Sequence, residues 1–459
     1  MTGVLSAVFW GVAVLSLLVF VHEGGHYLAA RACGVRVTEF FLGMPCRFKL
    51  SRKSRSHGTE MGVTPILLGG YTRICGMENT SDDLLAPALM AVQRAGRLSA
   101  SDLAAKLGCD VDRAYGLLAT LADWAAVRPY YDPALGEHEG QADWPASFET
   151  LRRDGDLLTE YDRGHDFSKE GSSGYGEPRD PGMGASEFLE HERSRTYLGC
   201  GFWRRCGMLL AGPAVNLLVA LAVVTGSFMV MGVQMASNEP VVGSVSSGSY
   251  AEAAGLQAGD RITAVDGEGV STYDELVSAI KPYLSSGTDF TLVYERGGSH
   301  LETTVDLEDG QPAEYLGITN QAYTYYPTLA QALRGSVVYG GMVAEYALKL
   351  IVPTHTMEVL DQSSSVVGIS VMASEAASAG VPTLVFFIGA ISMSLGFMNL
   401  LPIPPLDGGK ILIEVIQLVS RRQVSARAQS IVSYVGLAFF LFVFVVAMRN
   451  DILNFVIGG

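Results

Sequence analysis

The residues best suited to chemistry are two histidines and a glutamate in the motif H-E-G-G-H, which runs from His22 to His26. On a helix, positions i and i+4 share a face, so both imidazoles can bind one Zn²⁺, with Glu23 beside the metal-bound water. The motif ends a long apolar stretch, where ionisable groups are costly and usually functional. The alternative is a helix end whose polar groups merely reach water. The position therefore favours a zinc site within a membrane span.

A catalytic zinc site needs a third protein ligand and one open position. The candidate is Asp407, in the run N-L-L-P-I-P-P-L-D-G-G from Asn399 to Gly409. Three prolines, which cannot continue a helix, break the apolar segment just before it. Non-helical backbone at membrane depth is tolerated where it is buried in protein or lines a wet cavity. A Pro-rich loop outside the membrane would not explain an aspartate at the break.

The composition is typical of a membrane protein that also carries soluble parts. Of 459 residues, 49% are hydrophobic and 17% charged, and the formal net charge of −15 argues against general nucleic-acid binding. A helix needs about 20 apolar residues to cross a bilayer. Four stretches are long enough: about Val4 to Ala30, Cys206 past Gly232, between Glu375 and Asp407, and between Arg427 and Arg449.

Basic residues predict the orientation of these spans. Arginines and lysines follow the first span, precede the second, and lie between the third and fourth. By the positive-inside rule these segments face the cytoplasm, so both termini and the segment from about 233 to 377 lie outside. All six cysteines fall on the cytoplasmic or membrane side, which fits reduced thiols inside and no external disulfides.

The chain divides into seven parts by composition. Strands are expected around Thr59–Thr64, and residues 77–198 form a polar, acidic insertion whose first part (81–133) has helical periodicity with a turn at Gly108. Its second part (134–192), rich in Gly, Asp, Glu, Ser and Pro, is predicted to be a flexible linker. The predicted boundaries are 1–76, 77–198, 199–236, 237–322, 323–376, 377–412 and 413–459.

These motifs resemble the site-2 proteases, intramembrane zinc metalloproteases, and in particular the bacterial regulator-of-sigma-factor branch. The resemblance rests on H-E-G-G-H in the first span and L-D-G-G in the third. It is supported by A-G-P-A-V-N-L (Ala211 to Leu217) and G-T-E-M-G-V-T-P-I-L-L-G-G-Y (Gly58 to Tyr71). It covers most of the chain except the insertion. It implies a polytopic α-helical protein of the bacterial inner membrane, with four transmembrane helices and its active site towards the cytoplasm.

The resemblance also assigns roles to residues. His22, His26 and Asp407 are implied as zinc ligands and Glu23 as the general base. Residues 58–74 match a membrane-embedded β-hairpin whose edge pairs with the unwound substrate, the alternative being a plain cytoplasmic hairpin. The implied substrate-binding residues are Asn399, Gly69, Gly70, Tyr71 and, unless its role is only structural, Asn216. The implied partners are the bilayer and single-span membrane proteins such as anti-sigma factors or signal-peptide remnants.

Residues 239–320 resemble a single bacterial PDZ domain, on A-E-A-A-G-L-Q-A-G-D-R-I-T-A-V-D-G and a later Y-L-G-I. The loop Tyr315, Leu316, Gly317 and Ile318 would offer N–H groups to a C-terminal carboxylate. The domain either restricts access until a substrate's outer domain is removed or has a purely structural role. Residues 324–352 suit a helix on the outer membrane surface or one packed on the spans. Many members of this protease branch carry two PDZ domains, and here one is visible. The G-P-x-G-I element that the branch carries after the domain appears here only as V-V-G-I (Val366 to Ile369).

The first part of the insertion looks like a winged-helix domain, with Trp124 to Tyr131 as the wing. Few basic and several acidic residues argue against DNA binding, so a cytoplasmic protein partner or a structural cap is favoured. Two other hypotheses concern the whole chain. A catalytically silent scaffold that recruits partners would not need the full set of ligands and base. A membrane-anchored zinc protease for soluble substrates would carry the motif outside the span.

Overall fold

The computed structural model describes residues 2–67, 69–78, 82–139, 141, 144–307, 312–422 and 424–453. The chain forms two compact units. The first comprises Met1–Val224 and Gly335–Gly459, and the second comprises Thr225–Arg334.

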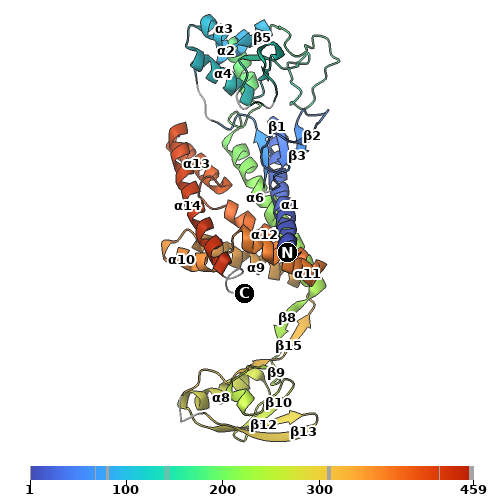
Figure 1. The fold of residues 1–459 in the computed structure, drawn as a ribbon, viewed down its shortest axis with the longest axis vertical. Helices are drawn as coiled ribbons and strands as arrows, with labels where there is room; N and C mark the ends of the chain where they lie inside the picture. Colours follow the sequence, from blue (N-terminus) through green and yellow to red (C-terminus); the bar gives the residue numbers. More distant parts are fainter. Residues whose placement is uncertain are drawn as a thin grey trace. The chain divides into compact units, whose positions relative to one another are not determined.

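Four helices are long and apolar enough to cross a membrane, by length and composition, within the described part of the chain. They are α1 (Thr2–Ala32), α6 (Phe202–Met231), α12 (Val381–Asn399) and α14 (Ala426–Ile452) (Figure 1). Few charges interrupt them, and backbone groups in lipid must be satisfied within the helix. The predicted four-span, mostly helical architecture is confirmed, and the chain is a multi-pass membrane protein.

Shorter helices surround these four. Helices α9 (Leu329–Lys349) and α10 (Pro353–Gln362) meet at a bend of 116° and could together count as a fifth, broken span. Helix α11 (Val366–Ala379) begins with the V-V-G-I run, and the N–H groups of Ser365 and Gly368 donate to the carboxylate of Asp451 on α14 at 2.6 and 3.0 Å. A carboxylate is favoured there because the first turn of a helix carries unpaired N–H groups. This contact fixes α11 against α14.

A four-stranded sheet follows α1. Its strands are β1 (Val37–Leu42), β2 (Leu50–Lys53), β3 (Glu60–Val63) and β4 (Gly70–Ile74), in the order β2-β3-β1-β4. The prediction that residues 58–74 form a hairpin is wrong, because β1 lies between β3 and β4, parallel to β3 and antiparallel to β4. Strand β1 buries Val37, Phe40 and Phe41, whereas all four residues of β2 are exposed, so the apolar strand takes a central place in the sheet and the polar strand an edge. Strand β4 is thereby left at an edge of the sheet.

The insertion begins with a helical subdomain. Its elements are α2 (Leu85–Ala95), β5 (Arg97–Ser99), α3 (Ala100–Leu107), α4 (Val111–Asp123), β6 (Val127–Tyr130), a 3₁₀ turn (Pro133–Leu135) and β7 (Ser147–Thr150). Gly108 ends α3 with φ 67°, as expected for the turn between two helices. The three strands pair in the order β5-β7-β6. The subdomain therefore extends beyond residue 133, since the middle strand comes from residues 147–150.

The prediction that residues 134–192 form a flexible linker is also wrong for the described residues. Arg153 and Glu192, the latter on α5 (Ala185–Arg193), are fully buried and joined at 2.8 Å. Arg36, which precedes β1, is fully buried as well and pairs with Asp162 at 2.7 Å and Glu192 at 2.6 Å. These carboxylates raise the pKa of the Arg36 guanidinium. Arg36 in turn holds the pKa of Asp162 below its usual range, and Arg153 together with Arg36 does the same for Glu192. We call this group the Arg36 clamp; it fixes the insertion to the sheet.

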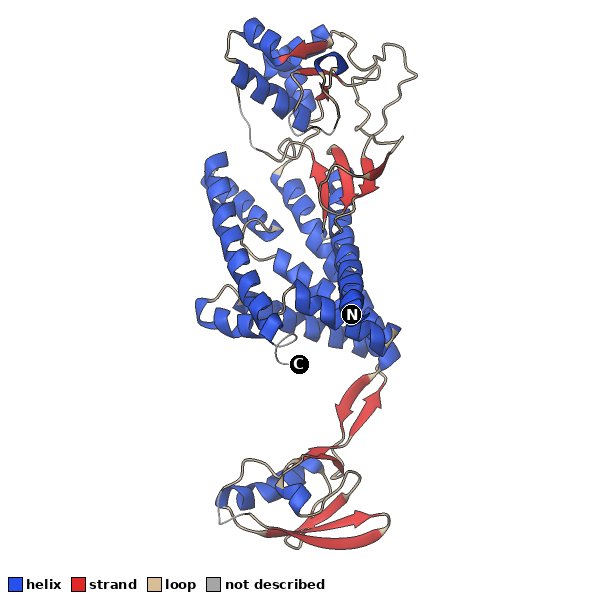
Figure 2. Ribbon diagram, in the orientation of Figure 1, coloured by secondary structure: helices blue, strands red, loops and turns tan. Residues whose placement is uncertain are grey.

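The second unit, which the chain enters from α6 and leaves into α9, is an α+β domain whose first and last strands form a two-stranded ribbon (Figure 2). Strands β8 (Val233–Ala236) and β15 (Ala322–Tyr325) form the ribbon. The domain's main sheet has the order β11-β10-β12-β13, and β9 pairs with β14. Its remaining elements are β9 (Val242–Val245), α7 (Tyr250–Ala253), β10 (Arg261–Val265), β11 (Glu268–Gly269), α8 (Tyr273–Ser286), β12 (Phe290–Arg296), β13 (Ser299–Val305) and β14 (Ile318–Asn320). An apolar core that includes Ile262, Leu276 and Phe290 holds them together.

Candidate active site

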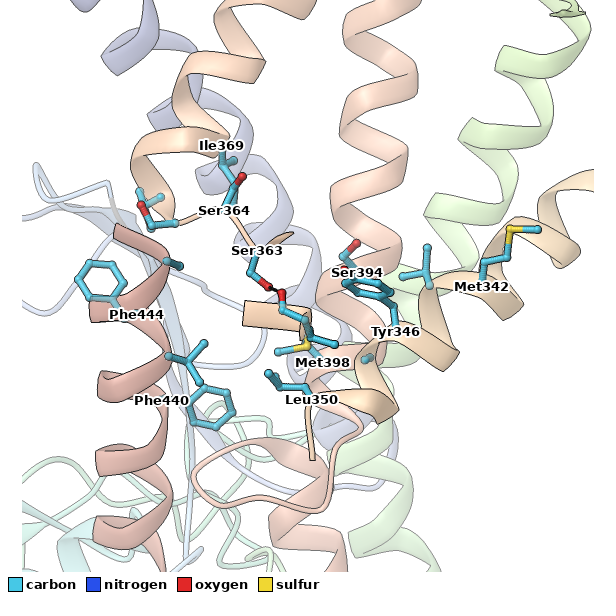
Figure 3. Close-up of a pocket in the computed structure, with 17 residues that line it drawn as sticks. Met342, Tyr346, Leu350, Ser363, Ser364, Ile369, Ser394, Met398, Phe440 and Phe444 are labelled. Atoms are coloured by element: carbon cyan, nitrogen blue, oxygen red, sulfur yellow. Dashed lines mark hydrogen bonds between the residues drawn. The ribbon is translucent and has the colours of Figure 1, made fainter. Parts of the chain in front are cut away.

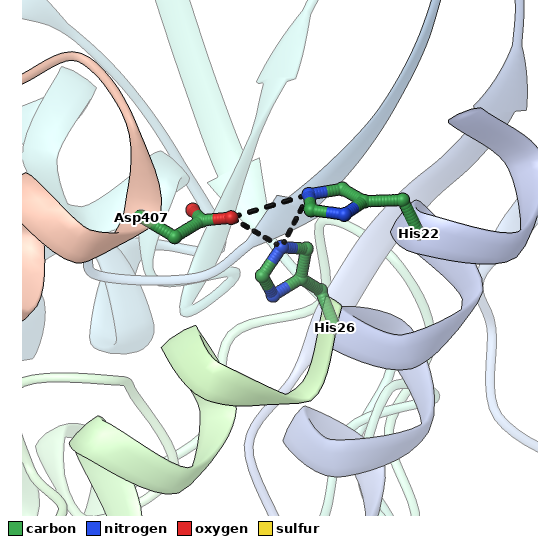
Figure 4. Close-up of side chains that lie close together, drawn as sticks. All are labelled: His22, His26 and Asp407. Atoms are coloured by element: carbon green, nitrogen blue, oxygen red, sulfur yellow. Dashed lines mark hydrogen bonds and ion pairs between the residues drawn. The ribbon is translucent and has the colours of Figure 1, made fainter. Parts of the chain in front are cut away.

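Three side chains from distant parts of the sequence converge between the helices. His22 and His26 lie one turn apart on α1, and Asp407 is the first residue of α13 (Asp407–Ser420) (Figure 4). Each is less than a tenth exposed. The Nε2 atoms of the two histidines are 3.2 Å apart, and each lies 3.1 Å from Oδ2 of Asp407. Among the described residues this is the one group of three His, Cys, Asp or Glu side chains arranged to hold a metal ion.

This triangle fits a zinc ion. Ligand atoms about 2.0–2.1 Å from a tetrahedral zinc lie about 3.3 Å from one another. The observed separations of 3.1–3.2 Å are close to that value. Two imidazole nitrogens and a carboxylate oxygen are donors that zinc accepts, and three protein ligands leave a fourth position open. The donor set is therefore that of a catalytic rather than a structural zinc site.

Helix α6 sets the orientation of His26. The Nδ1–H of His26 donates to the carbonyl oxygen of Met208 at 2.8 Å, which leaves Nε2 with a free lone pair for a metal. The two helices approach very closely at Gly25 and Gly212. A Cβ on Gly25 would lie 2.5 Å from the carbonyl oxygen of Ala211, and one on Gly212 would lie 2.3 Å from Nε2 of His26. Both positions therefore require glycine.

The break before α13 sets the position of Asp407. Helix α12 ends at Asn399, and α13 starts after the Pro-containing segment 400–406. Added Cβ atoms on Gly408 and Gly409 would lie 2.2 Å from the Leu400 carbonyl oxygen and 2.2 Å from the Pro404 nitrogen. The two glycines thus let α13 begin directly against the break. The second carboxylate oxygen of Asp407, Oδ1, faces Lys410 at 3.6 Å.

Glu23 lies half-buried beside the cluster, next to strand β4. The hydroxyl of Thr72 donates to the Glu23 carbonyl oxygen at 3.1 Å, and a Cβ on Gly70 would lie 3.5 Å from the Glu23 Cγ. No hydrogen bond or ion pair holds the Glu23 carboxylate to any residue that the structure describes. The carboxylate is therefore available to accept a proton.

The other predicted substrate-binding residues lie at the start of β4 and at the end of α12. Tyr71 on β4 stacks on Phe41 with ring centroids 5.4 Å apart. Gly69 is buried beside Met44. Asn399 closes α12 and donates from Nδ2 to the Leu395 carbonyl oxygen at 3.1 Å, within its own helix. Gly69, Gly70 and Tyr71 thus lie on the sheet edge nearest Glu23, whereas the Asn399 amide is hydrogen-bonded within its own helix.

Asn216 on α6 is fully buried and contacts a histidine of the cluster. Its Nδ2 lies 3.4 Å from Nδ1 of His22, while its Oδ1 has no hydrogen-bond partner among the described residues. A metal bound at Nε2 leaves the proton on Nδ1, which must then donate. A half-turn of the Asn216 amide exchanges Nδ2 and Oδ1. The Nδ1–H of His22 can then donate to Oδ1 of Asn216. The sequence predicted substrate binding or a structural role for Asn216 but gave no sign of its contact with His22, or of the contact between His26 and the Met208 carbonyl.

Replacing Asn216 by Leu is expected to weaken zinc binding by about tenfold to a hundredfold, since partners of a ligating histidine typically contribute that much. The replacement keeps the branching of the side chain but leaves the Nδ1–H of His22 unpaired. Competition with a chelating dye measures the zinc affinity. Ser227→Ala, which removes a buried hydroxyl about three turns further along α6, is the control and should leave affinity unchanged. Equal zinc affinity for Asn216→Leu and the wild type would contradict this role.

A cavity of about 700 Å³, not lined by His22, His26 or Asp407, lies among α9, α11, α12 and α14 (Figure 3). Side chains such as Met342, Leu350, Met398, Phe440 and Phe444 line it. Its described lining contains serines and one tyrosine but no His, Cys, Asp, Glu, Lys or Arg. Such a lining offers no metal ligand and no general base, so this cavity is not a competing active site.

Four apolar helices with two histidines and an aspartate converging between them define a multi-pass membrane metallopeptidase. The chain belongs to peptidase family M50, the site-2 protease family, whose sequence profile matches residues 10–443. It is 26% identical to the zinc metalloprotease RasP of Shouchella clausii, over 96% of this chain and 97% of that protein. It is 25% identical to the regulator of sigma-W protease RasP of Bacillus subtilis, over 96% and 97%, and 26% identical to the zinc metalloprotease RasP of Geobacillus kaustophilus, over 99% and 100%.

Proposed function

We propose that this chain is a zinc-dependent endopeptidase that hydrolyses peptide bonds within the transmembrane segments of single-span membrane proteins. The observation that carries the proposal is the buried triangle of His22, His26 and Asp407, which joins the first apolar helix to the break after the third. The names of two relatives, zinc metalloproteases from S. clausii and G. kaustophilus, agree with zinc as the metal. The name of the B. subtilis relative, regulator of sigma-W protease, favours anti-sigma factors as one substrate class.

In the proposed reaction, His22, His26 and Asp407 hold the zinc, and Glu23 is the general base. Zinc bound there would supply Lewis-acid chemistry, which activates a water and polarises the scissile carbonyl. Glu23 accepts the proton of the attacking water and passes it to the leaving amine. Its carboxylate has no partner in the described chain that would compete for that proton. Asn216 and the Met208 carbonyl keep the two imidazoles in the orientation that presents Nε2.

A substrate helix must unwind before its carbonyls can react, and the open edge of β4 offers a place for the extended segment. Strand β4 pairs with β1 on one side and with no other described strand. Main-chain bonds to such an edge hold a peptide in extended form. Gly70 brings the edge close to α1, since a Cβ there would lie 3.2 Å from Val19 Cγ1 and 3.5 Å from Glu23 Cγ. Asn399, at the end of α12, would hydrogen-bond the extended segment further along.

The second unit is proposed to be a PDZ domain, within the boundaries 237–322. Gly317, with φ 90°, shapes the loop Tyr315, Leu316, Gly317 and Ile318, which borders a cavity of about 590 Å³. Asp306 and Glu314 also line this cavity. They would repel a C-terminal carboxylate, so a structural or access-restricting role is favoured over capture of a free C-terminus. We place this domain and both termini outside the cell membrane.

The insertion is proposed to be a winged-helix-like domain on the cytoplasmic side. The order α2-β5-α3-α4-β6-β7 supports this fold, with β6 and β7 forming the wing. Between residues 77 and 198 there are 23 Asp and Glu but only 12 Lys and Arg. That balance disfavours DNA and favours a protein partner or a cap on the cytoplasmic side.

Removing and restoring the metal tests the proposed function. The protein is reconstituted in liposomes with a single-span substrate, stripped of metal with a chelator, and then supplied with zinc or magnesium. Cleavage should disappear on stripping and return with zinc but not with magnesium, because magnesium prefers octahedral oxygen ligands. Cleavage that persists in fully stripped protein would overturn the zinc mechanism.

A further inference from the structure

A cavity of about 830 Å³ lies between the insertion and the sheet, within the first unit. Strands β1 and β4 form one side of it, and α4, β6 and nearby loops of the insertion form the other. Its lining includes Arg73, Glu78, Asp123, Tyr131, Trp144 and Tyr161. We call it the junction cavity. None of the residues assigned to zinc binding or proton transfer lines it.

The junction cavity lies at the far end of the strand that begins beside the active site. Gly70 starts β4 next to Glu23, Thr72 bonds to the Glu23 carbonyl, and Arg73 already lines the cavity. A strand rises about 3.3 Å per residue, so the five residues of β4 span about 16 Å. A peptide paired along β4 therefore needs only about five residues to pass from the active site to the cavity.

The two walls of the cavity are fixed to each other. The fully buried Arg36 clamp joins the start of the sheet to the insertion through Asp162 and Glu192. Arg36 also donates to the Ala125 carbonyl oxygen at 3.0 Å, and the Gly76 N–H donates to Asp123 at 3.1 Å. Buried, fully paired groups of this kind are costly to separate. The cavity is thus a preformed feature and not a gap between independent parts.

The lining favours a cationic occupant. Its two arginines are already paired, Arg73 with Glu39 at 3.2 Å and Arg128 with Glu149 at 2.7 Å. Asp123 and Glu78, in contrast, have no ion pair within 4.0 Å among the residues that the structure describes.

Aromatic rings of Tyr131, Trp144 and Tyr161 complete the lining. Lys and Arg side chains bind both carboxylates and aromatic faces. Segments that flank a membrane span on its cytoplasmic side are rich in these residues.

We propose that the junction cavity binds the basic cytoplasmic flank of the substrate while the neighbouring segment pairs with β4. This inference rests on the proposed function, since it requires cleavage of a membrane-spanning substrate held along that edge. It gives the acidic insertion a direct part in substrate choice. Substrates with Lys or Arg next to the span would be preferred over substrates with neutral flanks.

The test compares two single-span substrates with the same span, one with three Lys or Arg in its cytoplasmic flank and one with Gln in their place. The full-length protein in liposomes should cleave the basic substrate with a KM about five- to tenfold lower. The double variant Asp123→Asn, Glu78→Gln should lose that preference while cleaving the neutral substrate as well as the wild type does. The control double variant Asp112→Asn, Glu187→Gln removes two exposed carboxylates of the insertion that lie outside the cavity. It should keep the preference for the basic substrate.

An unchanged preference in the cavity double variant, or no preference in the wild type, would overturn the inference. Cross-linking separates this failure from failure of the proposed function. A photoreactive residue at Tyr131, in a Glu23→Gln background, should cross-link to the basic flank and not to the neutral one. Absence of this cross-link would overturn the inference even where the wild type cleaves both substrates. Cross-linking without any cleavage by the wild type would instead contradict the proposed function.

Discussion

Replacing Glu23 by Gln is expected to leave zinc binding intact and to lower the rate of cleavage by about a hundredfold to ten-thousandfold. The change removes the proton acceptor while keeping the size of the side chain and all three metal-binding residues. Zinc content by elemental analysis, together with cleavage of a single-span substrate in liposomes, measures both effects.

The matched control for this prediction is Glu345→Gln. Glu345 is an exposed residue of α9 whose carboxylate pairs with Lys349 at 3.0 Å. The control protein should bind zinc and cleave substrate as the wild type does. Cleavage by Glu23→Gln at the rate of the control would mean that another group accepts the proton.

The second large effect is expected at Asp407. Asp407→Asn should lose most of its zinc and more than about 99% of its activity, because a neutral amide is a poor zinc ligand and only two imidazoles remain. Zinc titration of the stripped protein, followed by the same cleavage assay, gives both values. The side chain keeps its shape, so the close packing of Gly408 and Gly409 against the break is preserved.

Lys410→Gln is the control for this second prediction. Lys410 faces the other carboxylate oxygen of Asp407 at 3.6 Å and is about half exposed. Since it is not a ligand, its replacement should change zinc affinity little. Full zinc occupancy in Asp407→Asn would show that the third ligand lies elsewhere in the chain.

The features that local sequence pattern encodes were predictable. The four apolar spans follow from length and hydropathy. The shared face of His22 and His26 follows from the helical repeat, because residues four apart lie one turn apart. Asp407 could be proposed because three prolines must end the preceding helix, although only the folded chain brings it to 3.1 Å from both histidines.

The strand order was not predictable, because it depends on pairing between segments distant in sequence. The pattern around residues 58–74 contained two strands with a turn-like segment between them, which is also how a hairpin looks. Strand β1 separates them because it pairs in parallel with β3 and antiparallel with β4. The parallel pairing requires the chain to cross over through β2, and no local signal shows such a crossover.

The fold of the second half of the insertion was hidden for a different reason. Its Gly-, Asp- and Glu-rich composition is that of solvated chain, and burial of its charges becomes favourable only when opposite charges meet them. Those partners come from far away: Asp162 pairs with Arg36, 126 residues earlier. The contact of Asn216 with His22 was hidden likewise, since it joins residues 194 positions apart.

The most direct test of the central claim is to map the bond that the zinc-loaded protein cuts. A purified single-span substrate is incubated with the wild type in liposomes, and the products are identified by mass spectrometry. Products formed in parallel by Glu23→Gln are subtracted as background. New ends within the apolar span, formed only by the wild type, are the predicted result. New ends confined to the soluble flanks would contradict the account, because a cluster buried among the spanning helices should cut at membrane depth.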